Sequence, residues 1–381
     1  MSGPLAGLRV LEMQAIGPVP WAGMMLADMG ADVLRVDRPE PSQTGVRDDE
    51  RFQFSGRGKR SLQANLKTPE GRDLVLDLAR HADVLLEGLR PGVMERLGLG
   101  PDDCLARNPA LVYGRMTGWG QSGPLAHQVG HDINYIATTG VLHAIGPAAG
   151  PPSVPLNLIG DFGGGAMLLL VGVFAALLET KTSGQGQVVD AAMVDGSLAL
   201  LAPILGQWQA GHWSDRRQSN RLDGGAHFYT CYATSDNQHV AVGAIEPRFY
   251  AALLKGLGLL DAALPHQHDK SAWPALRERF ATIFRQHTRA HWSTVFEGTE
   301  ACVSSVLSFS ELSSHPHLAQ RGSFVDVDGA MHPAPAPRFS RTPSRSPSCV
   351  GGAHAVRCTS GEAALAEWGL EKHRSLGTRT Y

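Results

Sequence analysis

The sequence predicts an α/β protein with a large, Rossmann-like doubly wound domain and a smaller α+β domain. Three observations support this fold class. Short apolar runs alternate with helical patterns between residues 8 and 116, which favours a parallel sheet covered by helices. From Tyr229 the pattern changes to short strands followed by helices. The chain has 381 residues, 43% of them hydrophobic, which is enough for one large or two medium domains.

The first elements form a strand–helix–strand unit. Residues 8–12 are an apolar run, residues 21–29 have helical spacing, and residues 32–37 are a second apolar run. This order predicts a βαβ unit with parallel strands. The pattern continues with an amphipathic helix over 70–81, a strand over 83–87, a short helix over 91–97 and a strand over 110–116. An open, doubly wound sheet is the expected result.

The rest of the chain is predicted to be less regular. The expected segments are a helix over 132–144, a Gly/Pro-rich loop over 146–155, an apolar helix from Gly163, a helical and then polar stretch over 185–225, strands over 229–233 and 239–242, and helices to about residue 296. Residues 332–349 are rich in Pro, Ser and Arg, and we expect them to be extended.

Composition argues against several classes of function. The net charge is −2, from 34 basic and 36 acidic side chains, so no basic field is expected for nucleic acid or an anionic membrane. The five cysteines form no Cys-x-x-Cys pair, and we expect reduced thiols rather than disulfides or a zinc site. Met167–Leu178 is the most apolar run, but its 12 residues are too few to span a bilayer. The N-terminus lacks the pattern of a signal peptide, so a soluble, cytoplasmic protein is expected.

The sequence also lacks the common nucleotide-binding motifs. The turn after the first predicted strand, residues 13–18, contains no Gly-x-Gly-x-x-Gly, and the chain has no Walker A lysine motif. NAD, FAD and ATP are therefore not expected as cofactors.

Three polar residues stand out by their surroundings. His131 starts a predicted helix, and its usual pKa near neutrality suits proton transfer in either direction. Asp161 precedes the most apolar helix and the run Gly163–Gly165, whose amides could stabilise an enolate. Glu246 ends an apolar run and could orient a histidine. Taken alone, local chemistry favours structural roles, namely a helix-start histidine, an N-cap aspartate and an exposed glutamate.

Basic residues gather near the predicted carboxyl ends of strands. They are Arg38, the turn Arg57-Gly58-Lys59-Arg60, Arg90 and Arg96. Open α/β sheets bind ligands at this edge, so a phosphate-bearing ligand is one interpretation. A solvated rim of charge is the other.

Four ordered motifs carry a family resemblance. They are Gly-His-Asp-Ile-Asn-Tyr at 130–135, Pro-Leu-Asn-Leu-Ile-Gly-Asp-Phe-Gly-Gly-Gly at 155–165, Gly-Gln-Val-Val-Asp-Ala-Ala-Met-Val-Asp-Gly at 186–196, and Val-Gly-Ala-Ile-Glu-Pro-Arg-Phe-Tyr at 242–250. From about Leu5 to about Thr342 the chain resembles the α-methylacyl-CoA racemases of the family III CoA-transferase superfamily.

The resemblance implies an interlocked homodimer. A large CoA-binding α/β domain would comprise residues 1–190 and 330–381, linker helices residues 191–224, and a small α+β domain residues 225–329. The active site would lie between the large domain of one subunit and the small domain of the other.

The resemblance also assigns roles to residues. His131 and Asp161 match the acid/base pair, and Glu246 matches the glutamate that supports the histidine. The positions that match CoA contacts are Arg38, Gln63, Ala64, Asn65, Leu66, Glu87, Gly88, Leu89, Arg96, Gly130, Asp132 and Tyr135. The implied reaction inverts C2 of a 2-methylacyl-CoA thioester by 1,1-proton transfer through an enolate. CoA is part of the substrate, and no metal or other cofactor is expected.

Two alternatives are retained. In a family III CoA transferase, the aspartate at position 161 would be a nucleophile that forms an acyl anhydride. The chain could also bind acyl-CoA without catalysis. The presence of both His131 and Glu246 favours racemisation. The sequence departs from the family's pattern at His227 and Ser305, which replace prolines, and after Pro343, so the shape of the substrate pocket and the packing of the tail are left open.

Overall fold

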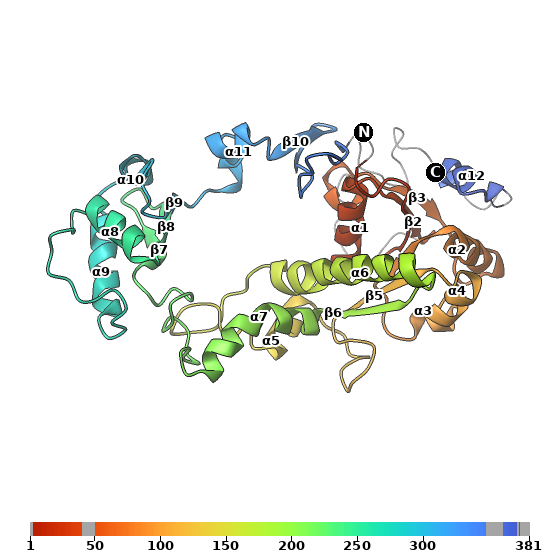
Figure 1. The fold of residues 1–381 in the computed structure, drawn as a ribbon, viewed down its shortest axis with the longest axis horizontal. Coiled ribbons are helices and arrows are strands. Elements are labelled where there is room, and N and C mark those ends of the chain that lie inside the picture. Colours follow the sequence, from red (N-terminus) through yellow and green to blue (C-terminus); the bar gives the residue numbers. More distant parts are fainter. Residues whose placement is uncertain (1–2, 40–49, 348–360, 372, 374–381) are drawn as a thin grey trace. The chain divides into compact units, whose positions relative to one another are not determined.

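A six-stranded parallel sheet forms the centre of the larger of two compact units (Figure 1). The computed structural model describes residues 3–39, 50–347, 361–371 and 373. The larger unit comprises Met1–Thr139, Leu156–Leu200 and Pro316–Tyr381, and the smaller one comprises Gly140–Pro155 and Leu201–His315. The domain boundaries implied by the family resemblance stay a prediction.

The sheet confirms the doubly wound prediction. Its strand order is β3-β2-β1-β4-β5-β6, with every neighbouring pair parallel. The strands are β1 (Arg9–Met13), β2 (Asp32–Asp37), β3 (Arg60–Gln63), β4 (Val84–Glu87), β5 (Val112–Thr117) and β6 (Val188–Ala192). The sequence predicts β1, β2, β4 and β5 because these strands are largely buried and apolar. It misses β3 and β6, which are the two edge strands, since a half-exposed edge needs no continuous apolar run.

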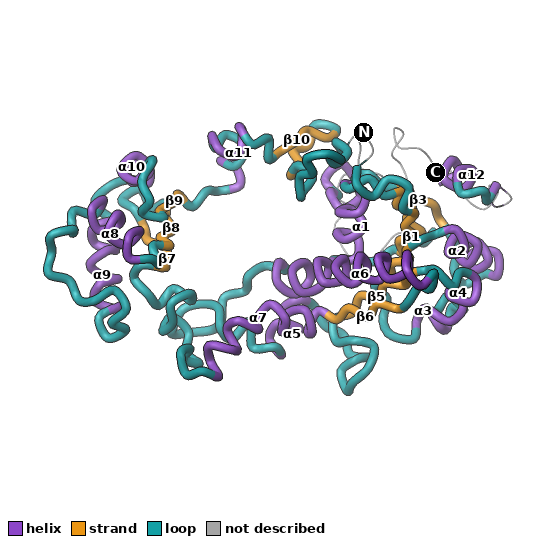
Figure 2. Tube along the Cα trace, viewed as in Figure 1, coloured by secondary structure: helices purple, strands orange, loops and turns teal. Residues whose placement is uncertain are grey.

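Helices cover both faces of the sheet. Alternate strand residues point to opposite faces, so Leu11 and Val10 belong to different cores. One core includes side chains of α2 and α12, and the other includes side chains of α1 and α6. Figure 2 marks the helices in purple and the strands in orange. The helices are α1 (Pro18–Asp28), α2 (Pro69–His81), α3 (Val93–Arg96), α4 (Pro101–Arg107), α5 (Asp132–Thr138), α6 (Met167–Ser183), α7 (Met193–Gln209), α11 (Pro316–Gln320) and α12 (Gly361–Glu367). The larger unit also has 3₁₀ turns at Glu50–Phe52 and Phe54–Gly56, and an antiparallel hairpin of β10 (Phe324–Val327) and β11 (Ala330–Pro333).

The apolar helix is longer than the sequence predicts. A π-helical segment, Leu158–Ala166, continues directly into α6, and together they span 26 residues, with an 18-residue window of mean hydropathy 2.0. The prediction that this region is too short to cross a membrane was therefore wrong, because only the uninterrupted apolar run was counted. Length and composition alone are weak evidence for a membrane span, since the core helix of a soluble protein has the same properties. Here Leu169, Leu170 and Val173 are buried in the core beside β5.

The basic turn at residues 57–60 is neutralised inside the fold. Arg57 pairs with Asp28 at 2.6 Å, and Lys59 pairs with Glu12 at 2.6 Å. Arg60 pairs with Asp32 at 2.5 Å. Arg57 and Lys59 are buried, so both sequence interpretations of this turn, a phosphate site and a solvated rim, were wrong.

The Lys59–Glu12 pair lies under the N-terminal half of α1. Lys59 Nζ also donates a hydrogen bond to the carbonyl of Pro20 at 2.7 Å, and a Cβ on Gly23 would overlap the Glu12 carboxylate. Burial lowers the pKa of Lys59 and raises that of Glu12, while their mutual attraction opposes both shifts. The pair therefore connects β1, α1 and the start of β3.

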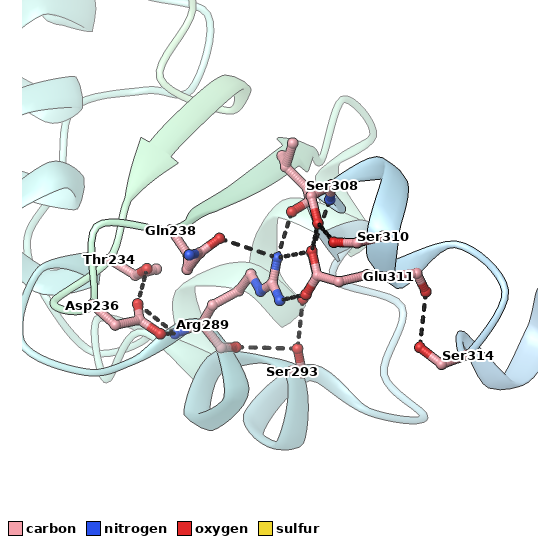
Figure 3. A network of polar contacts seen from close by, with 11 residues as sticks. Thr234, Asp236, Gln238, Arg289, Ser293, Ser308, Ser310, Glu311 and Ser314 are labelled. Carbon is pink, nitrogen blue, oxygen red and sulfur yellow. Dashed lines mark hydrogen bonds and ion pairs between the residues drawn. The ribbon is translucent and has the colours of Figure 1, made fainter.

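The smaller unit is an α+β structure around an aromatic core. Its antiparallel sheet has the order β7 (Tyr229–Ala233), β8 (His239–Gly243) and β9 (Val303–Ser305). The helices are α8 (Pro247–Gly256), α9 (Trp273–Phe284) and α10 (Arg289–Phe296), with a 3₁₀ turn at Phe309–Glu311. At the start of α10, Arg289 bonds Glu311 and the carbonyl of Val306, and its amide donates to Asp236 (Figure 3). This network fastens the segment after β9 to α10.

His227, one of the departures from the family's pattern, is buried in this aromatic core. Its Nε2 lies 2.8 Å from Tyr250 Oη, and its ring meets Phe228 and Phe280 edge-on. Burial, assisted by His268, lowers the pKa of His227 to about 4. A neutral imidazole thus fills the position. The other departure, Ser305, bonds Ser293 at 2.7 Å between their hydroxyl oxygens.

Removing one partner of the Lys59–Glu12 pair should strongly destabilise the larger unit. We expect Lys59→Met to lower the free energy of unfolding by about 3–5 kcal/mol, because it leaves a buried carboxylate without its counter-charge. Urea unfolding followed by circular dichroism measures this loss. Lys67→Met, at an exposed position, is the control and should change stability by less than about 0.5 kcal/mol. Equal stability of the two variants would contradict the assigned role.

The smaller unit should lose stability in mild acid through His227. The pKa is 6.5 in the unfolded chain and about 4 when folded, so the unfolded state binds the proton first as the pH falls below 6.5. Between pH 7 and pH 5 this group should cost about 2 kcal/mol of unfolding free energy. Urea unfolding at both pH values should show a smaller loss for His227→Leu than for the wild type. The exposed His239→Gln should behave like the wild type.

Candidate active site

The candidate site lies at the carboxyl edge of the parallel sheet. The winding of the chain reverses between neighbouring strands β1 and β4, and open α/β sheets bind ligands beside the loops that follow two such strands. These loops approach closely, since a Cβ on Gly88 would lie 2.9 Å from Val19 Cγ2 and 3.2 Å from the Cβ of Ala15. Gly88 therefore lets the start of α1 pack against the loop after β4.

Asp161 lies inside the π-helical segment and not at the N-cap of the apolar helix, so that part of the prediction was wrong. Its Oδ2 accepts a hydrogen bond from Asn157 Nδ2 at 3.0 Å. Its backbone amide donates to Asp132 Oδ2 at 2.7 Å. A Cβ on Gly17 would lie 3.1 Å from Asp161 Oδ2, so the turn before α1 borders the carboxyl group. Three separate segments thus converge on Asp161.

His131 is the N-cap residue of α5. The capping hydrogen bonds are made by the backbone and by Asn134, whose amide donates to the carbonyl of His131 at 2.8 Å and whose Oδ1 accepts from the His131 amide at 3.0 Å. The imidazole is not needed for the cap, and the residue is exposed. The predicted helix-start position is confirmed.

The surroundings of Asp161 shift its acidity. Burial raises the pKa of Asp161, and the hydrogen bond from Asn157 opposes this shift. The charge of Asp132 adds to the increase, whereas His131 acts to lower the pKa. His131 is thus close enough to act on Asp161 electrostatically. The result is a half-buried carboxyl group that holds its proton at higher pH than a solvated aspartate.

Most predicted CoA-contacting residues follow strands of the sheet. Arg38 follows β2, Gln63–Leu66 end and follow β3, and Glu87–Leu89 end and follow β4. Gly130–Tyr135 come after β5, and Arg96 ends α3. Because the strands are parallel, the loops after them share one edge of the sheet. The CoA contacts themselves stay predictions.

Several of these side chains are already engaged within the protein. Glu87 is buried, and its carboxylate accepts hydrogen bonds from Leu89 N at 2.7 Å and Arg115 Nε at 2.9 Å. Tyr135 Oη donates to the carbonyl of Gly130, and its ring contacts Trp119 edge-on. Both side chains make their hydrogen bonds within the protein. Contacts of Glu87 and Tyr135 with CoA would therefore be made by backbone atoms.

The run Gly163–Gly165 serves helix packing. These residues lie within the π-helix, where each amide bonds the carbonyl five residues earlier, so the predicted role of their amides in stabilising an enolate was wrong. Gly164 faces α7, and a Cβ there would lie 2.7 Å from the amide nitrogen of Ser197. A Cβ on Gly196 would be 1.8 Å from the carbonyl oxygen of Gly164. The glycines let two helix backbones touch.

Glu246 belongs to the smaller unit, where it is the N-cap residue of α8. It is exposed, as expected of a residue at a strand end. Its charge helps to raise the pKa of the Cys302 thiol, after the larger effect of burial. Within the described part of the chain, no group of three or more His, Cys, Asp or Glu side chains is arranged to hold a metal ion.

Comparisons with known proteins agree with this geometry. The family model "CoA-transferase family III" matches residues 5–351. Alpha-methylacyl-CoA racemase of Mus musculus is 45% identical, covering 98% of this chain and 95% of the relative. The enzyme of that name from Homo sapiens is also 45% identical, covering 89% and 87%. The crystal structure of a CAIB/BAIF family protein from Brucella suis has a TM-score of 0.80 at 25% identity, covering 97% of this chain and all of the other. The chain belongs to CoA-transferase family III.

Proposed function

We propose that the protein is a racemase or epimerase that inverts C2 of 2-methylacyl-CoA thioesters. The observation that carries this proposal is that the start of α5, where His131 lies, is bonded to Asp161, because Asp132 Oδ2 accepts a hydrogen bond from the Asp161 amide at 2.7 Å. The 45% identity to racemases over nearly the whole chain supports the reaction class. Family membership alone would leave the activity open.

The chemistry requires two groups on opposite faces of C2. One group removes the C2 proton, the electrons of the C–H bond move to the thioester oxygen as an enolate forms, and the other group returns a proton to the opposite face. For one hand of substrate, neutral His131 is the base and protonated Asp161 the acid. For the other hand, the Asp161 carboxylate is the base and the His131 imidazolium the acid. Exchange with water restores the starting protonation states.

The raised pKa of Asp161 suits this double role. A carboxyl group must carry its proton when it acts as an acid, and burial increases the protonated fraction near neutral pH. Proton return from Asp161 is easier than from a fully solvated aspartate. No metal and no cofactor beyond the CoA moiety of the substrate is required by this mechanism.

Glu246 completes the proposed set. A carboxylate beside the histidine would orient the ring and stabilise its charged form. In the proposed assembly this carboxylate comes from a second copy of the chain, as the family resemblance implies.

An exposed apolar face on the larger unit supports a homodimer. Val171 and Leu178 on α6 are 58% and 66% exposed, and Leu200 on α7 is 50% exposed. Val171 and Leu178 are seven residues apart and therefore share one face of α6, and exposed apolar side chains on one face are typical of a surface covered by another molecule. We propose that a second copy covers them, and that the protein acts in the cytoplasm without inserting into a membrane. Cys104, Cys231 and Cys302 are free thiols, whereas Cys349 and Cys358 lie outside the described residues.

The alternative reaction is CoA transfer with Asp161 as the nucleophile. It would pass through an acyl anhydride and then a thioester between enzyme and CoA. Hydroxylamine intercepts both species. A hydroxamate at Asp161 after incubation with acyl-CoA would therefore show that the reaction is CoA transfer and not racemisation. Binding of acyl-CoA without proton exchange or covalent trapping would identify a non-catalytic binder.

The acid/base proposal predicts deuterium uptake at C2. In heavy water, wild-type protein should exchange the C2 proton of one or more members of a panel of branched fatty acyl, sterol-derived and arylpropionyl-CoA esters. His131→Ala and Asp161→Ala should each lower the exchange rate by at least about 10²-fold, because each removes one proton-transfer group. Mass spectrometry of the recovered thioester measures the uptake. His127→Ala, an exposed histidine four residues away, is the control. Full activity in both site variants would refute the assignment.

The dimer proposal predicts a change in sedimentation. Wild-type protein should sediment at twice the 40.7 kDa chain mass, and Val171→Glu should shift it towards a monomer, because a charge is costly to bury in an apolar interface. Lys181→Glu, an exposed position on the same helix, controls for the added negative charge. A wild-type monomer in sedimentation equilibrium would contradict the proposal, and association of that monomer with vesicles would instead assign the face to a membrane.

A further inference from the structure

We propose that the Asp132 side chain is a positioning residue for Asp161, because its carboxylate holds the backbone amide of Asp161 in the first turn of the π-helix. This inference rests on the proposed function, in which Asp161 is an acid/base group. It differs from the role that the family resemblance assigns to Asp132, which is contact with CoA.

The Asp132 carboxylate binds a backbone amide that the π-helix itself leaves without a partner. In a π-helix each amide bonds the carbonyl five residues earlier, so the amides of residues 158–161 have no partner within the helix. Asp161 is the fourth residue of this segment, and its amide donates to Asp132 Oδ2 at 2.7 Å. The hydrogen bond fixes the backbone of the residue that carries the reacting carboxyl group. It therefore fixes the direction of the Cα–Cβ bond of Asp161.

Gly160 leaves the space that the Asp132 carboxylate occupies. A Cβ on Gly160 would lie 2.5 Å from Asp132 Oδ2 and 2.9 Å from its Cγ. The Asp132 carboxylate can reach the helix only because residue 160 has no side chain. On the other side of this gap, Ile136 Cγ2 would be 3.3 Å from the same Cβ. The site is thus built around the carboxylate of Asp132.

Burial of the Asp132 carboxylate costs folding free energy. Asp132 is 6% exposed, and its Oδ1 is buried without a hydrogen-bond partner among the described residues. A buried carboxylate oxygen without a partner lowers stability. Such a cost is tolerated most often at functional sites.

The charge of Asp132 also acts on Asp161. The groups that face Asp161 are Asn157, His131 and Asp132, together with Tyr135, whose pKa is raised by burial and by Asp161. Burial and Asp132 raise the pKa of Asp161, whereas Asn157 and His131 lower it. Removing the Asp132 charge should therefore lower the pKa of Asp161. In the pH–rate profile of the direction in which Asp161 is the base, the acidic limb would then move to lower pH.

Kinetics separate positioning from CoA binding. For C2 exchange, Asp132→Ala should lower kcat about 10²-fold with KM within about twofold, because the reacting carboxyl group is misplaced while CoA contacts are kept. Asp132→Asn retains an oxygen acceptor and should recover most of this rate, with its acidic limb at lower pH. Gly160→Ala should reproduce the loss without altering Asp132. Asp102→Ala, which removes an acidic residue from the first turn of α4, is the control and should match the wild type.

A raised KM with unchanged kcat in Asp132→Ala would overturn the inference and return Asp132 to CoA binding. Circular dichroism spectra and thermal midpoints verify that each variant is folded. A second measurement needs no activity. The ¹³Cγ resonance of Asp161, assigned with Asp161→Asn, is titrated without substrate in the wild type and in Asp132→Asn, and we expect a lower pKa in the variant.

The two proposals fail in different ways. If wild-type protein exchanges no C2 proton, the proposed function fails, and the titration still decides whether Asp132 acts on Asp161. An identical Asp161 titration in both proteins would remove the electrostatic part of the inference, and a wild-type kcat in Asp132→Ala would overturn the positioning role even if racemisation is confirmed.

Discussion

All six strands of the central sheet run in one direction, and the geometry of the site depends on this constraint. Parallel strands place their carboxyl ends at one edge, and the winding of the chain reverses there between β1 and β4. The loops that carry Arg38, Gly88 and His131 all start from this edge. Distant parts of the sequence meet in this way, since Gly17 in the turn after β1 borders the Asp161 carboxyl group.

The interior beneath this edge is held by charges that are neutralised in pairs. Lys59 with Glu12, Arg57 with Asp28, and Arg115 with Glu87 are all mostly or fully buried. Buried pairs contribute little net stability but are costly to break, so they specify one arrangement of strands and helices. The same pairing removes these cations from the set available to an anionic ligand. Arg38 and Arg96, by contrast, are exposed.

The π-helix is the local feature that distinguishes this site from an ordinary helix terminus. It contains one more residue in each hydrogen-bonded turn than an α-helix, which leaves an additional amide without a partner at its start. Asn157 and Asp132 satisfy groups of Asp161 in this first turn, while Gly164 brings the helix against α7. The surroundings that place the Asp161 carboxyl group therefore also set its pKa.

The sequence by itself determined the parallel α/β class, the buried strands β1, β2, β4 and β5, and the prominence of His131 and Asp161. Apolar periodicity and helix-start residues are local signals, so they can be recognised without knowledge of tertiary contacts. Only the tertiary structure decided that β3 and β6 are edge strands, that Arg57 and Lys59 are buried in ion pairs, and that Asp161 lies within a π-helix. It also decided that Asp132 bonds the amide of Asp161. These features depend on contacts between distant segments, and neither the spacing nor the polarity of a short stretch of sequence encodes them.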